Sequence, residues 1–255
     1  MAMTDLTTLR PKRKSRGGRR TKAGYNSTPL LLRPILWLWR LTWQVTFYAV
    51  LLVLAVVGLF SFVDPPSTIY MNEEAQRLGN LKHEWVPIER ISPVMARSVV
   101  AAEDANYCLH WGFDVDAIRD VIAEGGRRGA STISQQVVKN VFLWHDRSWT
   151  RKGLEALLTP VVEAMWSKQR IVEVYLNVAE FDEGVFGVQA AARHYFGVDA
   201  DQLSATQAAR LAAILPSPKR RSASRPSGFV QQRTSQIVSG AAAIRADGRA
   251  DCFQG

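Results

Sequence analysis

The chain has 255 residues, and its 32 Lys and Arg against 23 Asp and Glu give a formal net charge of +9. Ten of the basic residues and one acidic residue lie before residue 41, which leaves 22 of each sign in the remainder. The excess positive charge is confined to the N-terminal tail. This argues against a basic nucleic-acid-binding domain, because the excess charge lies where anionic lipid headgroups would attract it.

Residues 1–40 are basic and lack apolar periodicity, so we predict a disordered tail. Residues 41–63 carry no charged side chain, and at 1.5 Å per residue such a helix covers a hydrocarbon core of about 30 Å. Because basic residues precede this span, the positive-inside rule places the tail in the cytoplasm. A cleaved signal peptide is the alternative, but the apolar run is too long and lacks a small-residue cleavage pattern. We predict an uncleaved transmembrane anchor.

Residues 64–255 remain for one globular domain, which is long enough to bury a single substantial core. Apolar residues recur there at three- and four-residue spacing, so we predict a mostly helical domain. The predicted helices cover residues 93–104, 114–124, 131–143, 150–166, 168–179, 184–196 and 204–214. The stretches Pro65 to Trp85 and Pro216 to Pro226 are predicted to be irregular.

The run AEDANYCLHWGFD, residues 102–114, concentrates side chains that carry chemistry. Glu103 and Asp104 fall near the end of a predicted helix that begins at Ser92 and Pro93. A carboxylate there opposes the helix dipole and costs stability. A local rule broken without structural gain is typical of a functional site, whereas the alternative is a solvated acidic pair that caps the next turn.

A second polar group lies in GASTISQQVVKN, residues 129–140. A helix that begins near Ser131 brings four polar side chains to one face, namely Thr132, Gln136, Lys139 and Asn140. Amide groups and a lysine suit hydroxyl and phosphate ligands. A solvated helix face is the commoner origin of such a pattern, and from this segment alone both interpretations stay open.

A third group contains Arg151, Lys152 and Glu155, which lie within one turn of a predicted helix. Two cations therefore flank one carboxylate. Taken alone, the pattern favours an ordinary helix salt bridge over a functional site.

Two cysteines, Cys108 and Cys252, permit a disulfide in an oxidising compartment but do not require one. The chain has no CxxC or HExxH spacing, and its four histidines form no ligand cluster in the sequence. We therefore predict no structural or catalytic zinc.

In their order and spacing these motifs resemble the glycosyltransferase module of bacterial peptidoglycan synthases, which polymerises lipid II. The resemblance covers roughly residues 85–225. It rests on ED-x-x-aromatic-x-x-His-x-Gly at 103–112, Gly-x-Ser-Thr-Ile-x-Gln-Gln-x-x-Lys-Asn at 129–140, Arg-Lys-x-x-Glu at 151–155 and Tyr-Leu-Asn at 175–177. The chain most resembles the monofunctional, membrane-anchored transglycosylases of Gram-negative bacteria, glycosyltransferase family 51. It lacks a Ser-x-x-Lys motif and room for a penicillin-binding domain, so no transpeptidase activity is expected.

The resemblance implies a mostly α-helical, lysozyme-like fold. It also implies that Glu103 is the general base, which takes the proton from the sugar 4-hydroxyl of incoming lipid II. Undecaprenyl diphosphate then leaves the growing chain, and an α-linked donor becomes a β-1,4 glycan. A carboxylate against apolar walls can be tuned toward neutral pH, and Val99, Val100 and Trp111 are candidates for those walls.

Lys139, Arg151 and Lys152 are the candidates to stabilise charge on the departing diphosphate. The resemblance makes Glu155 the second essential carboxylate, acting on the leaving group directly or through a divalent cation, Mg²⁺ or Mn²⁺. Further substrate-binding residues that it implies are Asp104, Tyr107, His110, Thr132, Gln136 and Asn140, with Tyr107 at a position where the family usually has Phe. No other cofactor is expected.

The resemblance also implies a place in the bacterial inner membrane, with a single pass, a cytoplasmic N-terminus and a periplasmic catalytic domain. Lipid II, the growing glycan and the membrane are the expected partners, and cell-wall synthesis or division proteins are further candidates. No nucleic acid partner is expected.

Two other functions compete with this interpretation. A glycan-cleaving enzyme would also use two carboxylates on a helical fold, but it needs no cation cluster such as Lys139, Arg151 and Lys152. A catalytically silent scaffold for cell-wall machinery is the second alternative, and the intact Glu103 and Glu155 argue against it.

Overall fold

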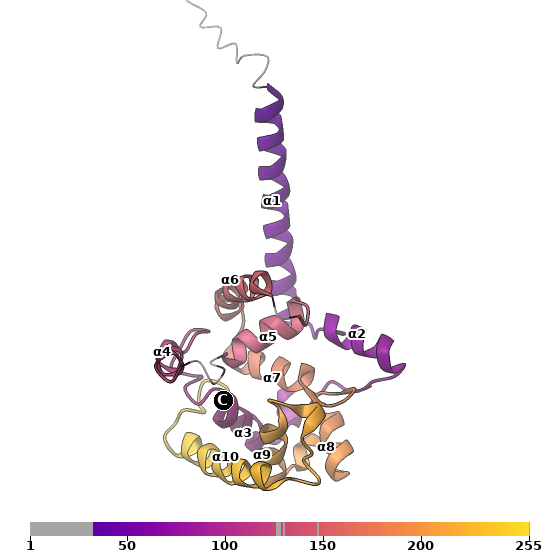
Figure 1. Cartoon of the computed structure of the whole chain (residues 1–255), viewed down its shortest axis with the longest axis vertical. Helices are drawn as coiled ribbons and strands as arrows, with labels where there is room; N and C mark the ends of the chain where they lie inside the picture. The colour runs from indigo at the N-terminus through magenta and orange to yellow at the C-terminus, as the bar shows by residue number, and fades with distance from the viewer. Residues whose placement is uncertain (1–32, 126–128, 130, 147, 255) are drawn as a thin grey trace, which may run out of the picture. The chain divides into compact units, whose positions relative to one another are not determined.

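The computed structural model describes residues 33–125, 129, 131–146 and 148–254 (Figure 1). The chain forms two compact units, residues 1–49 and 50–255. The predicted disorder of residues 1–32 lies outside the described residues.

Helix α1 is Arg33–Phe60, so it begins before the predicted span and includes residues 33–40 of the predicted tail. Residues 33–40 are helical because Pro34 fits a first helical turn and an apolar run follows it. The helix ends at Phe60 rather than at residue 63. Pro34–Phe60 is long and apolar enough to cross a membrane, with a mean hydropathy of 2.1 in its most apolar window.

The second unit is mostly helical, which confirms the predicted fold class. Its helices are α2 (Ile69–Leu78), α3 (Pro93–Glu103), α4 (Val115–Ala123), α5 (Ile133–Phe142), α6 (Trp149–Met165), α7 (Lys168–Val178), α8 (Val188–Phe196), α9 (Ala205–Ile214) and α10 (Gly228–Ala246). Short 3-10 turns cover η2 (Ile88–Arg90), η3 (Ala200–Gln202) and η4 (Pro218–Arg220).

A small three-stranded sheet, which the sequence did not predict, joins distant parts of this unit. Its strands are β1 (Lys82–His83), β2 (Glu180–Asp182) and β3 (Val185–Phe186), in the order β1-β3-β2. Strand β1 pairs with β3 in parallel, and β2 pairs with β3 antiparallel. Strands of two or three residues are too short to show a period-two pattern.

Two helices lie where none was predicted. Helix α2 falls within the stretch predicted to be irregular, and the Thr68 hydroxyl caps it by accepting from the Met71 N–H at 3.1 Å. Gly79 ends it at φ +80°. Helix α10 follows Ser227, whose side chain caps its first turn. The predicted helix 184–196 begins only at Val188, because β3 and the turn at Gly187 come first.

Two helix groups position the site (Figure 1). Helices α3, α9 and α10 pack against one another, and α5 packs against α6 and α7. Fully buried aliphatic side chains join the first group, among them Met95, Val99, Leu211 and Ile237. Burial of each such side chain contributes roughly 1.5–3 kcal/mol to the free energy of unfolding. The packing of these side chains therefore fixes the position of α3.

Candidate active site

Glu103 is the last residue of α3, and its side chain lies against α5. Gln136 of α5 donates its amide Nε2 to the Glu103 Oε2 at 2.9 Å. Burial raises the pKa of the Glu103 carboxyl above its ordinary value, and the hydrogen bond from Gln136 opposes that rise. The charges of Arg233 and Lys139 also favour the carboxylate, whereas neighbouring Asp104 disfavours it. The balance leaves a carboxylate that accepts a proton more readily than an exposed glutamate does.

The walls around Glu103 differ in part from those predicted. Val99 and Val100 are buried on α3, but Trp111 is 60% exposed and does not enclose the carboxylate. Tyr175 of α7 lies in the same group and donates its hydroxyl to the Gln136 Oε1 at 3.3 Å. This tyrosine belongs to the Tyr-Leu-Asn motif, which was recognised without a chemical role for it. Its contact fixes which end of the Gln136 amide faces Glu103.

Asp104 ties α3 to the beginning of α5. Its Oδ2 accepts from the Ile133 N–H at 3.0 Å, and its Oδ1 lies 2.7 Å from the His110 Nε2. An anion at a helix N-terminus is favourable, so Asp104 is stabilised where it sits. Thr132 caps the same helix and donates its hydroxyl to the Gly112 carbonyl at 2.7 Å. Three of the predicted substrate-binding residues therefore shape the loop between α3 and α4.

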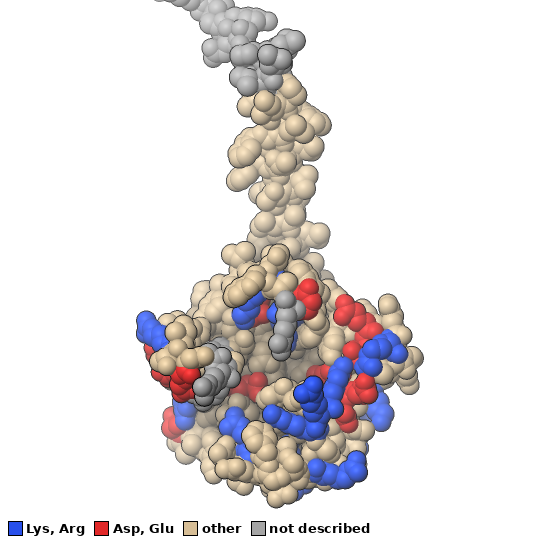
Figure 2. Space-filling view, in the orientation of Figure 1, with Lys and Arg blue, Asp and Glu red and all other residues tan. Residues whose placement is uncertain are grey.

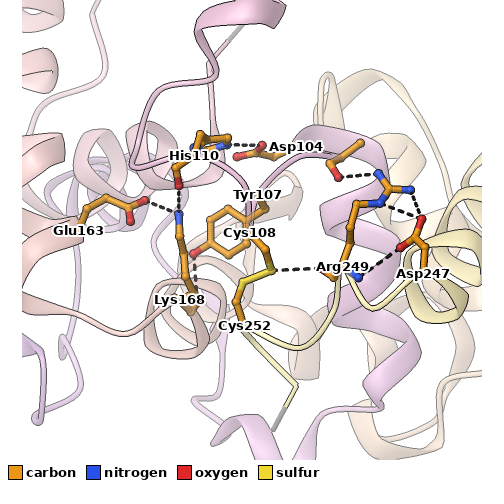
Figure 3. Close-up of a disulfide and its surroundings, with 10 residues drawn as sticks. Asp104, Tyr107, Cys108, His110, Glu163, Lys168, Asp247, Arg249 and Cys252 are labelled. Carbon is orange, nitrogen blue, oxygen red and sulfur yellow. Dashed lines mark hydrogen bonds and ion pairs between the residues drawn. A yellow bond between two sulfur atoms is a disulfide. The ribbon is translucent and has the colours of Figure 1, made fainter.

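The Tyr107 side chain packs inside the fold, next to the disulfide and Lys168 (Figure 3). Its side chain is fully buried, and its hydroxyl donates to the Lys168 carbonyl at 3.0 Å. We therefore reassign Tyr107 from substrate contact to support of the loop. Lys168 donates in turn to the His110 carbonyl and to Glu163, both at 2.9 Å. The half-buried Lys168 and the buried Glu163 hold the loop to α6 and α7, a role that the sequence interpretation missed.

Glu155 lies buried between two cations on α6. The Arg151 Nη1 donates to its Oε2 at 3.0 Å, and the Lys152 Nζ forms an ion pair with its Oε1. Only 3% of the Glu155 side chain is exposed. Lys152 also donates to the Ser131 hydroxyl at 3.2 Å, which connects α6 to the residues before α5. The predicted cluster of two cations around one carboxylate is thus present.

Lys139 of α5 is the third cation of the group. Burial lowers its pKa, and the neighbouring cations Arg151 and Lys152 lower it further, while Glu155 raises it. A desolvated cation beside two other cations interacts strongly with an incoming anion. Figure 2 shows acidic and basic side chains together around a hollow on this face of the second unit.

Two cavities flank the Glu103 and Gln136 pair. One has a volume of about 300 Å³ and acidic walls that include Glu103, Asp104, Asp114 and Asp120. The other has a volume of about 210 Å³ and is lined in part by Gln136, Lys139, Asn140, His145 and Tyr175. Asn140 thus shares a cavity with Gln136 and Lys139, as predicted from its place on the helix face.

His145 is a further cavity residue that the sequence interpretation missed. Its ring stacks on Tyr70 of α2 with centroids 3.9 Å apart. Burial and the charges of Lys139 and Arg151 lower its pKa to about 4, so it is neutral at pH 7. A lone histidine after a helix carries little signal in a sequence, because its cationic neighbours come from other elements.

Among the described residues, Asp104, His110 and Asp114 could together hold a metal ion, since their ligand atoms lie within 4.8 Å of one another. Both Asp104 oxygens already take part in contacts to Ile133 and His110. Both Asp114 oxygens accept hydrogen bonds as well, from the Ala117 N–H and from Asn106. The fold therefore accounts for this acidic group without a cation.

The cysteines form a disulfide that links the loop after α3 to the C-terminal segment (Figure 3). Cys108 and Cys252 are 144 residues apart in sequence, and their Cα atoms lie 5.7 Å apart. The sequence left this pairing open, because the fold alone brings the two segments together.

Comparison with known proteins agrees with the geometry. The family model described as Transglycosylase matches residues 71–242. A biosynthetic peptidoglycan transglycosylase of Jannaschia sp. (strain CCS1) is 61% identical over 202 residues, which cover 79% of this chain and 84% of the relative. Its counterpart in Xanthomonas campestris pv. campestris (strain B100) is 52% identical over 201 residues, covering 74% and 81%. That of Caulobacter vibrioides (strain ATCC 19089 / CIP 103742 / CB 15) is 48% identical over 204 residues, covering 78% and 89%.

The matched region contains every residue of the site described above except Tyr70 and those of the C-terminal segment. The sequence resemblance is thereby confirmed. The chain belongs to the transglycosylase family and is a peptidoglycan glycosyltransferase.

Proposed function

We propose that the chain polymerises lipid II into β-1,4 glycan strands and releases undecaprenyl diphosphate, with Glu103 as the general base. The observation that carries this proposal is the buried Glu103 carboxyl, which has a raised pKa and lies on α3 beside the cation group of α5 and α6. A base with a raised pKa can activate the attacking hydroxyl, and a cationic pocket can stabilise the leaving diphosphate of the same displacement.

The proposed reaction forms one bond at the anomeric carbon and breaks another. The Glu103 carboxylate takes the proton of the sugar 4-hydroxyl while that oxygen forms a bond to the anomeric carbon of the growing chain. The bond from this carbon to the diphosphate breaks, and the electron pair leaves with the diphosphate. Attack from the opposite face inverts the anomeric configuration. Gln136 supports this role because it fixes the carboxylate through a hydrogen bond of 2.9 Å.

Lys139, Arg151 and Lys152 act on the leaving diphosphate in this proposal. Each carries a positive charge close to Glu155, and charge stabilisation in a partly buried site exceeds that in water. Glu155 keeps Arg151 and Lys152 in place when the diphosphate is absent. A glycan-cleaving enzyme has no use for this group, which is why we favour synthesis over cleavage.

The two cavities suggest where the substrates bind. The cavity beside Lys139 suits the diphosphate end of the growing chain, whereas the acid-lined cavity suits a sugar with free hydroxyl groups. Asn140 and His145 would bind the growing chain, because they line the cavity beside Lys139. Asp104 and Thr132 line the acid-lined cavity, and His110 contacts Asp104.

A divalent cation at the diphosphate stays a prediction, and we derive no step from it. Glu155 is the carboxylate of the cation group, but its two oxygens already pair with Arg151 and Lys152. If these cations suffice, polymerisation continues after EDTA treatment. If polymerisation stops with EDTA and returns with Mg²⁺ or Mn²⁺, the ion is required.

We further propose that α1 anchors the chain in the bacterial inner membrane with its N-terminus in the cytoplasm and the second unit in the periplasm. The length and hydropathy of Pro34–Phe60 and the basic residues before it support this orientation. Cell-wall synthesis or division proteins are candidate partners, and the sequence given has no motif for transpeptidation.

The test is incubation of the detergent-solubilised protein with lipid II, followed by separation of products before and after lysozyme digestion. The proposal predicts a lysozyme-sensitive polymer and free undecaprenyl diphosphate. Shortening of preformed glycan without polymer formation would favour the cleavage function instead. A folded protein that does neither would favour the scaffold.

A further inference from the structure

The backbone around Glu103 is held by side chains from the C-terminal part of the chain. A helix C-terminus leaves its last carbonyl groups without partners inside the helix. Arg233 of α10 donates its Nη2 to the Ala102 carbonyl at 2.9 Å. Arg249 donates its Nη1 to the Ala105 carbonyl at 3.0 Å. Two guanidinium groups thus hold the backbone immediately before and shortly after the general base.

Arg249 is itself fixed in place (Figure 3). Its Nε and Nη2 both donate to the Asp247 Oδ2, at 2.9 and 2.7 Å. Its carbonyl oxygen lies 3.0 Å from the Cys108 sulfur, which bonds to Cys252. The same segment therefore reaches the active-site loop through an arginine and through a covalent bond.

Phe253 and Gln254 also contact α3 and the loop that follows it. The Phe253 ring packs against Tyr107, with centroids 6.1 Å apart. Gln254 accepts from the Arg97 Nη1 at 2.7 Å and donates to the Pro93 carbonyl. The segment 247–254 therefore contacts α3 near its first residues and the loop just after its last residue.

None of the contacts just described is made to the Glu103 carboxylate. The Glu103 carboxylate faces Gln136 on α5, while Arg233 and Arg249 bond to main-chain carbonyls. Their effect on the reaction must therefore pass through Glu103, by its position and by the charge near it. The positive charge of Arg233 also offsets the unfavourable helix dipole at a carboxylate that ends a helix.

We infer that α10 and the segment 247–254 position the general base, through Arg233, Arg249 and the Cys108–Cys252 disulfide. This inference rests on the proposed function, since it assigns these residues to Glu103 as a base. The family match ends at residue 242, so Arg233 lies inside it and Arg249 and Cys252 lie beyond it. They are positioning residues that touch no substrate.

The test compares Arg233→Gln with Arg245→Gln in the full-length protein, using labelled lipid II and steady-state kinetics. Arg245 is an exposed arginine on the same helix, which makes it a matched control. Arg233→Gln should lower kcat about tenfold or more with little change in KM, because a misplaced base slows chemistry. Arg245→Gln should behave as the wild type.

The pH dependence of kcat/KM distinguishes a positioning role of Arg233 from a loss of folded protein. Arg233 and Lys139 favour the Glu103 carboxylate, as does Gln136, and Asp104 and burial oppose it. Removal of the Arg233 charge therefore raises the pKa of Glu103 and moves the acidic limb of kcat/KM to higher pH. Arg233→Lys keeps the charge, so its acidic limb should stay near that of the wild type.

The contribution of the disulfide can be tested independently of the arginine variants. Reduction of the wild type and the Cys108→Ser/Cys252→Ser variant should both lower kcat, and the reductant should not slow that variant further. If Arg233→Gln fails to fold by circular dichroism, Arg249→Gln and the cysteine variant decide the matter, because both leave α10 intact.

The inference is overturned if the folded variants retain the kcat and the pH profile of Arg245→Gln. Failure of the proposed function looks different, since it would appear as a wild type that makes no polymer or as an active Glu103→Gln variant. A kcat that falls only in proportion to the folded fraction would also overturn the inference.

Discussion

Two carboxylates carry the proposed chemistry, and the structure gives them opposite surroundings. Glu103 is desolvated and accepts a single hydrogen bond, from Gln136, among the contacts described for its side chain, so its pKa is raised. Glu155 is buried but paired with Arg151 and Lys152. A pair of titratable groups with divergent surroundings is typical of an acid–base site. In our proposal, Glu103 takes a proton and Glu155 holds the cations.

The two carboxylates should respond differently to neutralisation. Glu155→Gln leaves Arg151 partly buried without its partner, which typically costs about 3 kcal/mol of unfolding free energy. It should also lower kcat by about a hundredfold, because the cations lose their position. Chemical denaturation and lipid II kinetics measure both effects. A variant with unchanged stability and activity would exclude Glu155 from this role.

The pH dependence follows from the direction of the Glu103 pKa shift. The base works only when deprotonated, so kcat/KM should rise with pH through a pKa above the usual glutamate value of 4.5. Because the folded-state pKa exceeds the unfolded one, the folded state binds more protons between the two values. The contribution of Glu103 to stability is therefore present at low pH and is lost as pH rises through the folded pKa. A pH–rate profile beside thermal denaturation at several pH values tests both signs.

The residues that carry the proposed chemistry were the easiest part of the site to recognise from the sequence. The order and spacing of the motifs singled out Glu103, Lys139, Arg151 and Glu155, which the structure places near one another, and their roles stay predictions. The sequence could not show that Tyr107 is fully buried, because a tyrosine near a histidine serves a core as well as a ligand. Nor could it find Arg233, since its contact with Ala102 spans 131 residues.

At the scale of elements, short periodic helices were predicted well and unusual segments were not. Helices α3, α5 and α7 lie within three residues of their predicted bounds, because their apolar residues recur at helical spacing. Helix α2 was missed because half of its ten residues are polar, although Thr68 and Gly79 provide cap signals at its ends. The sheet was missed because its strands are two or three residues long.

In the loop between α3 and α4, the backbone at Gly112 does not accommodate a residue with a Cβ atom. Gly112 has φ +84°, and a Cβ there would lie 2.6 Å from the Thr159 Cγ2. Gly112→Ala should therefore cost about 3 kcal/mol of unfolding free energy and reduce activity, since its carbonyl also accepts from Thr132.

Gly79→Ala is the matched control, because Gly79 has φ +80° and no atom within 4 Å of a Cβ. It should cost only about 1 kcal/mol from backbone strain. Urea denaturation of both variants measures the difference. Equal costs would show that the contact with Thr159 does not constrain the loop.

At the scale of the whole molecule, α1 contributes to both compact units. Its residues from 50 onward belong to the second unit, where the Trp166 indole donates to the Val57 carbonyl at 2.8 Å. The Arg170 guanidinium donates to the Phe60 carbonyl at 3.1 and 3.2 Å. The end of the helix is therefore part of the globular fold.

Truncation should distinguish the two parts of α1. Removal of residues 1–49 should leave a folded second unit that no longer partitions into membranes and polymerises lipid II slowly in vesicles. Removal of residues 1–64 should also lower thermal stability, because Trp166 and Arg170 lose their acceptors. Flotation with vesicles and circular dichroism measure these outcomes. Equal stability of the two truncated proteins would contradict the assignment of residues 50–60 to the second unit.

The central claim is that Glu103 is the base, and the most direct test is single-turnover kinetics of Glu103→Gln beside the wild type with lipid II at neutral pH. Glutamine keeps the shape of the side chain but cannot take the proton. The account predicts that bond formation falls by at least about a hundredfold, while the variant binds lipid II and unfolds at a temperature no lower than that of the wild type. Polymerisation by the variant at the wild-type rate would contradict it.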